Sequence, residues 1–133
     1  MDHLTLKTTQ RQQIVDLTPL LVKYLAEHRF RDGLLLVYSP HTTAGISVNE
    51  NADPSVKNDI TRCLSRLVPQ DAGYSHAEGN ADAHIKGSLI NFSQTFMVEN
   101  GKLLLGTWQG VFFMEFDGPR RREVWLKFVP VSA

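Results

Sequence analysis

The sequence has few of the features that mark common protein classes. Its 133 residues include one cysteine, Cys63, so no disulfide can form within the chain and a reducing compartment is expected. The 14 basic and 14 acidic residues cancel, which excludes a nucleic-acid binder driven by a bulk basic field and an acidic tail protein. No stretch approaches the roughly 18 apolar residues needed to cross a bilayer, and the start has no signal-peptide core. These absences predict a soluble, cytoplasmic protein.

The familiar catalytic motifs are missing as well. The chain has no GxGxxG, P-loop, GxSxG or HExxH motif and no cysteine pair at zinc-finger spacing. Strands and helices do not alternate regularly along the pattern, which disfavours a Rossmann unit.

What the sequence does contain is enough apolar material for one core. Hydrophobic residues make up 42% of the chain, and no Pro, Gly or Ser linker divides it, so residues 1–133 are expected to form one domain. Helices are expected to begin near Thr18, Asp53 and Asn80. Periodicity predicts strands over 4–8, 13–16, 34–38, 45–49, 94–99, 103–105, 111–116 and 123–131. This order favours an α+β fold, an antiparallel or mixed β-sandwich with about three flanking helices.

Several local signals place the turns and helix faces. Asn100-Gly101 is typical of a type I′ hairpin, because both central residues of that turn need positive φ. The helix after Asp53-Pro54 has an apolar stripe that includes Cys63, which we therefore expect to pack as a small hydrophobe. The third helix is expected to carry the apolar residues Ala81, Ile85, Leu89 and Ile90.

Three histidines lie in polar segments rather than on helix stripes, and they form the candidate metal site. His41 follows a buried strand, whereas His76 and His84 are eight residues apart. On an unbroken helix this spacing is about 12 Å of rise, too far for two ligands of one zinc ion, so the helix must be interrupted between them. Three imidazoles and a water would make an open, catalytic zinc site. The alternative is that all three are surface or turn residues.

Acidic residues lie close to these histidines in the sequence. Glu50, Asp53, Glu78 and Asp82 could orient the imidazole N–H groups, and Glu50 or Glu78 could act as a general base.

A second group of residues suits a phosphorylated ligand. The hydroxyls of Thr42 and Thr43 and the run 120–122 of three arginines match phosphate oxygens, although the run could instead be a solvated strand edge. Trp108 and Gln109 could stack on and hydrogen-bond to a planar ring, but core packing explains Trp108 equally well.

Two apolar runs predict self-association. Residues 103–105 and 111–114 offer more apolar strand surface than one small core is expected to cover, so a subunit interface would bury the remainder.

Three blocks of the sequence resemble the signature segments of the YjbQ family. They are HTTAGISVNENADPSVKNDI (41–60), HAEGNADAHIKGSLI (76–90) and LLLGTWQGVFFMEFDGPRRREVWLKFV (103–129). The resemblance covers nearly the whole chain in order. Members are often described as secondary thiamine-phosphate synthase enzymes.

The resemblance implies a β-sandwich-like domain that assembles as a homotrimer, with a histidine-lined, metal-compatible site in each subunit. Its metal ligands would be His41, His76 and His84, with zinc the expected ion. Its polar neighbours would be Thr42, Asn49, Glu50, Asp53, Glu78, Asn80, Trp108, Gln109 and Arg121.

Three functions stay open on this basis. The first is a thiamine-phosphate synthase-type transferase that acts on small phosphorylated heterocycles, with Glu50 or Glu78 as base and Arg121 as phosphate clamp. The second is metal-dependent hydrolysis of a small metabolite. The third is non-enzymatic binding of an anion or a metal by the trimer.

Overall fold

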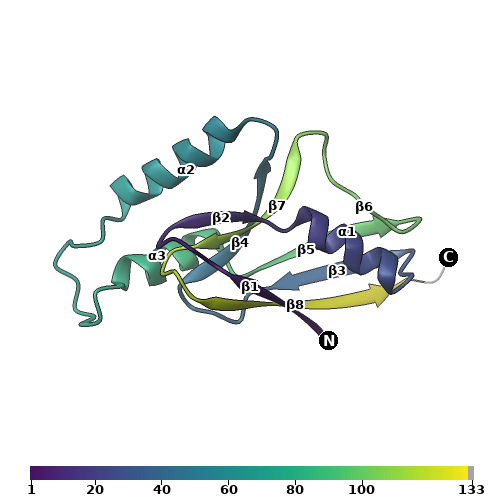
Figure 1. Ribbon diagram of the computed structural model, residues 1–133, viewed down its shortest axis with the longest axis horizontal. Coiled ribbons are helices and arrows are strands. Elements are labelled where there is room, and N and C mark those ends of the chain that lie inside the picture. The colour runs from purple at the N-terminus through teal and green to yellow at the C-terminus, as the bar shows by residue number, and fades with distance from the viewer. Residues whose placement is uncertain (132–133) are drawn as a thin grey trace.

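The computed structural model describes residues 1–131 and contains eight strands and three helices within them (Figure 1). The elements in chain order are β1 Asp2–Lys7, β2 Gln13–Asp16, α1 Thr18–Glu27, β3 Gly33–Tyr38, β4 Ala44–Glu50, α2 Pro54–Leu67, α3 Ala81–Ile90, β5 Ser93–Glu99, β6 Lys102–Leu103, β7 Gln109–Glu115 and β8 Arg121–Pro130.

The strands form two sheets in which every pair is antiparallel. The larger sheet has the order β1-β8-β3-β5-β6 and the smaller one the order β2-β7-β4. Three helices accompany the sheets, so the α+β, antiparallel sandwich fold expected from the sequence is confirmed.

The main core lies between the two sheets and under α1. Leu35 and Val37 of β3, Val111 and Phe113 of β7, and Leu25 of α1 all have no exposed surface. They belong to one continuous apolar cluster, because alternate residues of each strand point to the same side.

A smaller core covers the other face of β7. Phe112 and Met114 pack there with Ala83 of α3 and with the partly buried Ile60 and Leu64 of α2. Both faces of the run 111–114 are therefore covered within the chain, so the expectation that this run needs a subunit interface is wrong. Apolar residues are exposed elsewhere, on the outer face of the larger sheet.

Helix α2 stands apart from the sheets in Figure 1 and buries no residue completely. Its start is as predicted, because Asp53 caps it by accepting a hydrogen bond from the backbone N–H of Ser55. The prediction for Cys63 is wrong, since this residue is exposed. The helix contacts the body with only part of its apolar stripe.

The other two helices differ from expectation at their starts. The Thr18 hydroxyl does not cap α1, because it accepts a hydrogen bond from the N–H of Val111 on β7. Asn80 is the N-cap residue of α3 but makes no side-chain cap bond, and its amide donates to Asp117 instead. In both cases the side chain hydrogen-bonds to a residue remote in the sequence and not to the backbone of its own helix.

Helix α3 buries only part of the apolar set predicted for it: Ala81 is buried and Ile90 packs against the smaller core. Ile85 and Leu89 are 39% and 61% exposed, whereas Asp82 and Lys86 are fully buried. Lys86 donates to Asp82 over 3.0 Å, and Arg11 makes two hydrogen bonds to the same carboxylate. The helix thus rests on a buried ion cluster, which the apolar periodicity cannot indicate.

The Asn100-Gly101 hairpin prediction is confirmed. These residues join β5 to β6 with φ values of 52° and 77°. None of the three helices within residues 1–131 is long and apolar enough to span a membrane.

Candidate active site

Three separate segments enclose a polar pocket of about 340 Å³. The segments are the turn between β3 and β4, the start of α3, and the turn between β7 and β8. The lining residues are Pro40, His41, Thr42, Thr43, Glu78, Asn80, His84, Asp117, Arg120 and Arg122. We call this the His41 pocket.

A buried ion pair forms the floor of the His41 pocket. Arg122 is 2% exposed and Glu115 is 1% exposed. The guanidinium donates from Nε and Nη2 to the two carboxylate oxygens of Glu115 and from Nη2 to the hydroxyl of Thr43. Thr8 donates its hydroxyl to the same carboxylate over 2.8 Å. Every side chain of this network is therefore fixed in place.

One amino group of this guanidinium is left over. Within residues 1–131, Arg122 makes no hydrogen bond from Nη1, although the residue lines the pocket. Asn80 lacks a donor: its buried Oδ1 accepts no hydrogen bond from the described residues. Among the residues that line the pocket there is thus one spare donor, and one buried acceptor that has no partner.

The hydrogen bonds of His41 determine its protonation. The backbone N–H of Glu123 donates to Nε2 over 2.9 Å, so this nitrogen carries no proton. Burial and the nearby charge of Arg122 lower the pKa of His41 below its usual 6.5. At neutral pH the ring is neutral, with its proton on Nδ1.

We expect an NMR titration of His41 to give a pKa below 6.5 and the Nδ1–H tautomer at pH 7. In the unfolded chain His41 takes up its proton near pH 6.5, before the folded ring does. Its contribution to folding stability therefore decreases as the pH falls below about 6.5. A titration midpoint above 6.5, or a protonated Nε2, would contradict this assignment.

His76 and His84 approach each other as the spacing argument requires. Helix α3 begins only at Ala81, and the two rings lie 5.1 Å apart between centroids, almost perpendicular. His76 also lies 3.6 Å from the carboxylate of Glu78, which is largely exposed. The predicted interruption of the helix is confirmed, and it brings these two imidazoles together.

The complete three-histidine set does not fit a metal ion as arranged. Among residues 1–131, no group of three or more His, Cys, Asp or Glu side chains is positioned to hold one. His41 has no free lone pair, because Nε2 accepts the Glu123 N–H and Nδ1 bears the proton. Zinc binding stays a prediction, and the geometry restricts its ligands to the pair His76 and His84.

Metal content of the purified protein tests this restriction. If zinc binds, we expect it to be lost in His76→Ala and His84→Ala and retained in His41→Ala, as measured by elemental analysis per subunit. Loss in all three variants would mean that His41 gives up its bond to Glu123 and that the three-ligand site is correct.

Four other predicted site residues lie elsewhere. Asn49 and Glu50 end β4 and pair with Gly110 and Gln109, so they lie at the opposite end of this strand from Thr43. Asn49 is six residues from Thr43 along the strand, a separation of about 20 Å. Trp108, which is 64% exposed, directly precedes Gln109. The structure thus divides the predicted residues into two groups.

The arginine run is divided by strand alternation. Arg122 and Arg120 line the His41 pocket, while Arg121 is exposed and does not line it. Arg120 also donates to the carbonyl and carboxylate of Asp117. Thr43, expected to contact a substrate, lines the pocket, but it is 5% exposed and its hydroxyl accepts a hydrogen bond from Arg122.

Sequence reasoning missed two members of this site, Glu115 and Thr8, which complete the network of Arg122. Asp117 pairs with Arg120, as its place next to the arginine run indicates, and also accepts from Asn80. The sequence did contain one signal for this network. Glu115 lies within the apolar strand 111–116, and a charged residue in a buried strand needs a partner of opposite charge.

The sequence of this chain is similar to those of known proteins over nearly its whole length. Residues 2–131 match the model of the family described as UPF0047 protein YjbQ-like. A UPF0047 protein of Methanocaldococcus jannaschii is 55% identical over 124 residues, which cover 93% of this chain and 90% of that protein. UPF0047 protein YugU of Bacillus subtilis is 47% identical over 127 residues, or 95% and 96% of the two chains.

Solved structures agree with this similarity. An uncharacterised YjbQ/UPF0047 protein of Clostridium acetobutylicum superposes with a TM-score of 0.94 at 50% identity, covering 97% of this chain and all of that one (100%). A hypothetical protein of Aeropyrum pernix gives a TM-score of 0.93 at 38% identity, with 98% of each chain covered.

Proposed function

Because the chain belongs to the UPF0047 protein YjbQ-like family, a description that states no activity, we propose its function from the His41 pocket. The pocket binds a small phosphorylated metabolite and supports a transfer reaction of the thiamine-phosphate synthase type. The observation that carries the proposal is the rigid, buried guanidinium of Arg122 with Nη1 unused at the pocket wall.

The donors around the pocket suit phosphate oxygens. Arg122 offers Nη1, neutral His41 offers Nδ1–H, and Thr42 and Arg120 complete the wall. Because Glu115 holds Arg122 in place, little reorganisation is needed when an anion binds.

The size of the pocket limits the ligand. About 340 Å³ is near the lower end of the range for small-molecule sites, which suits one small metabolite rather than a dinucleotide. In the proposed reaction a thiazole nitrogen forms a bond to the methylene carbon of a pyrimidine diphosphate. The carbon–oxygen bond breaks, and pyrophosphate leaves with the electron pair toward these donors.

Roles in the proposal follow from position. Glu78 is the predicted carboxylate that lines the pocket, whereas Glu50 lies at the far end of β4. Arg120 replaces Arg121 as the second phosphate clamp. His84 lines the pocket, and with His76, whose ring centroid lies 5.1 Å away, it is the pair that could hold a divalent ion.

A coupled assay with purified protein tests the function. We expect Arg120→Gln to lower kcat/KM about a hundredfold, the size of effect seen when one preorganised donor is removed. Arg121→Gln is the matched control, one residue further on the other face, and should retain activity. Unchanged turnover in Arg120→Gln would refute the proposed clamp. Phosphate binding without turnover of any substrate would favour the non-enzymatic anion-binding role.

Self-association as a homotrimer, implied by the family resemblance, is part of the proposal. Its support is the outer face of the larger sheet, where Leu34 lies beside Met97 and Val129 in register. These side chains are 40%, 60% and 46% exposed. Light scattering at micromolar concentration should give three times the chain mass, and a monomer would refute this part.

A further inference from the structure

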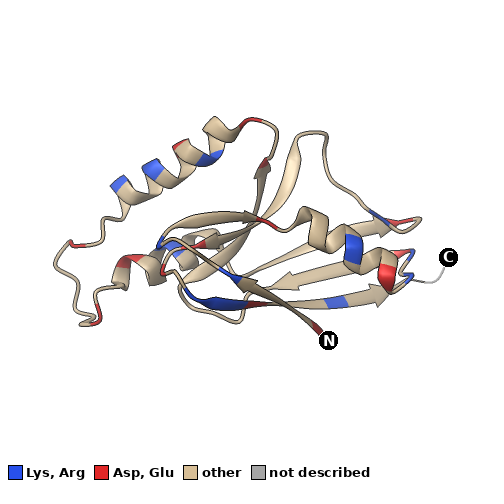
Figure 2. Cartoon of the chain, in the orientation of Figure 1, with Lys and Arg blue, Asp and Glu red and all other residues tan. Residues whose placement is uncertain are grey.

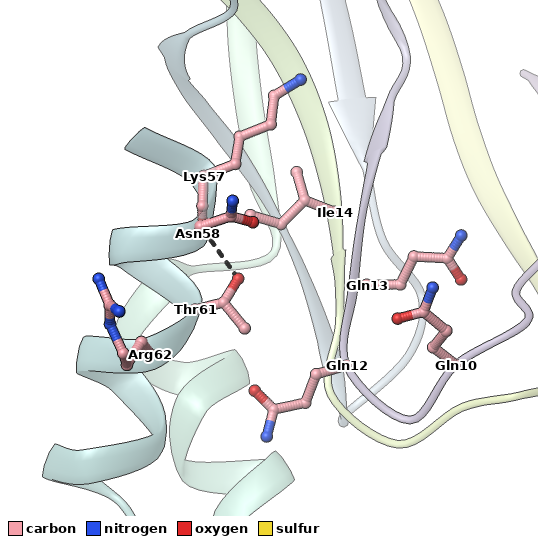
Figure 3. Close-up of a pocket in the computed structure, with 8 residues that line it drawn as sticks. All are labelled: Gln10, Gln12, Gln13, Ile14, Lys57, Asn58, Thr61 and Arg62. Carbon is pink, nitrogen blue, oxygen red and sulfur yellow. Dashed lines mark hydrogen bonds between the residues drawn. The ribbon is translucent and has the colours of Figure 1, made fainter. Parts of the chain in front are cut away.

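Strand β2 is an edge strand with a cleft beside it. In the smaller sheet it pairs with β7 on one side only. A cleft of about 680 Å³ is lined by Gln10, Gln12, Gln13, Ile14, Lys57, Asn58, Thr61 and Arg62 (Figure 3). Gln13 and Ile14 point to opposite faces of the strand in the figure, yet both line the cleft. The cleft therefore follows the edge of β2 and extends to α2.

The backbone along this edge is unpaired. In an antiparallel pair, every second residue directs its N–H and C=O away from the neighbouring strand. Within residues 1–131, no backbone group outside β7 bonds to residues 13–16. The cleft thus offers free backbone donors and acceptors at the spacing of a strand.

The side chains around the cleft suit a peptide backbone. Gln12 and Gln13 each use Oε1 as an acceptor, from Ser65 and from the N–H of Thr9, so their amide NH₂ groups keep free hydrogens. Asn58 of α2 makes no side-chain hydrogen bond among the described residues. Amides of this kind can both donate to and accept from peptide groups.

The charged side chains that line the cleft are all basic. They are Lys57 and Arg62. Figure 2 shows that the basic residues of α2 are spread along the helix. Arg62 is exposed and pairs with Asp59 on its own helix. Lys57 donates to the uncharged Asn51 over 3.0 Å and has no ion pair among the described residues. An acidic side chain of an occupant would complement its charge and would compete with Asp59 for Arg62.

We infer that β2 and α2 form a docking site for an extended, acidic peptide segment of another protein, which adds as a strand to the free edge of β2. This site lies apart from the His41 pocket and shares no lining residue with it. Backbone hydrogen bonds supply the binding, and Lys57 and Arg62 select acidic side chains.

A second copy of this chain fits the edge less well. The free edge strands of the larger sheet are β1, in which Asp2 and Lys7 cancel, and β6, which carries only Lys102. Strand β4 ends with Glu50, but the N–H of its Ile46 already donates to the carbonyl of Asn91. Apart from β2 itself, whose Asp16 carboxylate already accepts from the N–H of Thr18 and the amide of Asn51, no edge strand among residues 1–131 combines a free backbone with net negative charge.

A fluorescent hexapeptide alternating glutamate and valine, capped at both ends, is the probe. We expect saturable binding by fluorescence polarisation and chemical-shift changes centred on the amides of residues 13–16. Arg62→Glu should weaken binding about tenfold. Arg66→Glu, one turn further along α2 and outside the cleft, is the matched control and should leave binding unchanged.

Two peptide variants separate strand addition from simple charge attraction. N-methylation of the alternate peptide amides that face β2 should abolish binding, while N-methylation of the other amides should be tolerated. Absence of saturable binding, indifference to N-methylation, or equal loss in both arginine variants would overturn the inference. Amide protection of residues 13–16 that rises with protein concentration would assign the edge to a second copy and overturn it as well.

Discussion

Arg122→Met is expected to lower the free energy of unfolding by about 3–5 kcal/mol, because it leaves the carboxylate of Glu115 buried without its countercharge. Glu115 would keep only the hydroxyl of Thr8 and the N–H of Asp117 as donors. Urea denaturation followed by circular dichroism measures the loss. A change below about 1 kcal/mol would show that water or a neighbouring group compensates the carboxylate.

Two further variants isolate the cause of this loss. Arg121→Met removes the adjacent, exposed arginine and should change stability by no more than about 0.5 kcal/mol. The double variant Arg122→Met with Glu115→Leu removes both charges and should be more stable than Arg122→Met alone. If the double variant is less stable than the single one, lost packing rather than the orphaned charge explains the effect. If Arg122→Met does not fold, Arg122→Lys, which keeps a positive charge, replaces it in the stability measurement.

The second large effect is expected at Asp82 in α3. Asp82→Ala leaves Lys86, which is 1% exposed, without a countercharge and should destabilise the fold by about 3–5 kcal/mol. Lys86→Met should cost less, because Arg11 still makes two hydrogen bonds to Asp82. Thermal and urea unfolding of both variants give the order. A larger loss in Lys86→Met than in Asp82→Ala would contradict it.

Lowering the pH should cause part of the loss of stability expected for Asp82→Ala, because it protonates the same carboxylate. Burial raises the pKa of Asp82, but the hydrogen bonds and charges of Arg11 and Lys86 lower it more, so the folded pKa lies below 3.8. The stabilisation is complete above the unfolded pKa near 3.8 and decreases as the pH falls through the folded value. Asp82→Ala should therefore lose stability less steeply below pH 3.8 than the parent chain.

Local sequence signals predicted the parts of the fold that neighbours in the chain decide. The Asp53 cap depends on a backbone N–H two residues away, and the Asn100-Gly101 turn depends on its own two φ values. The interruption between His76 and His84 followed from helix geometry alone. These signals need no knowledge of the tertiary structure.

Tertiary partners decided the features that were predicted incorrectly. The hydroxyl of Thr18 is taken by β7, and the face of α3 is set by Arg11, which is remote in the sequence. The choice between Arg121 and its neighbours depends on which face of β8 each residue occupies, and a shift of one residue in register would reverse it. Periodicity cannot supply that register.

The pairing of β1 with β8 has a consequence for synthesis on the ribosome. Lys7 lies opposite Arg121, and Thr8 bonds to Arg120 and Glu115, so the floor of the His41 pocket joins residues more than 100 positions apart. The emerging amino-terminal strand has no partner until the eighth strand leaves the ribosome tunnel. The pocket therefore assembles only after translation has passed β8, and its first strand stays unpaired until then.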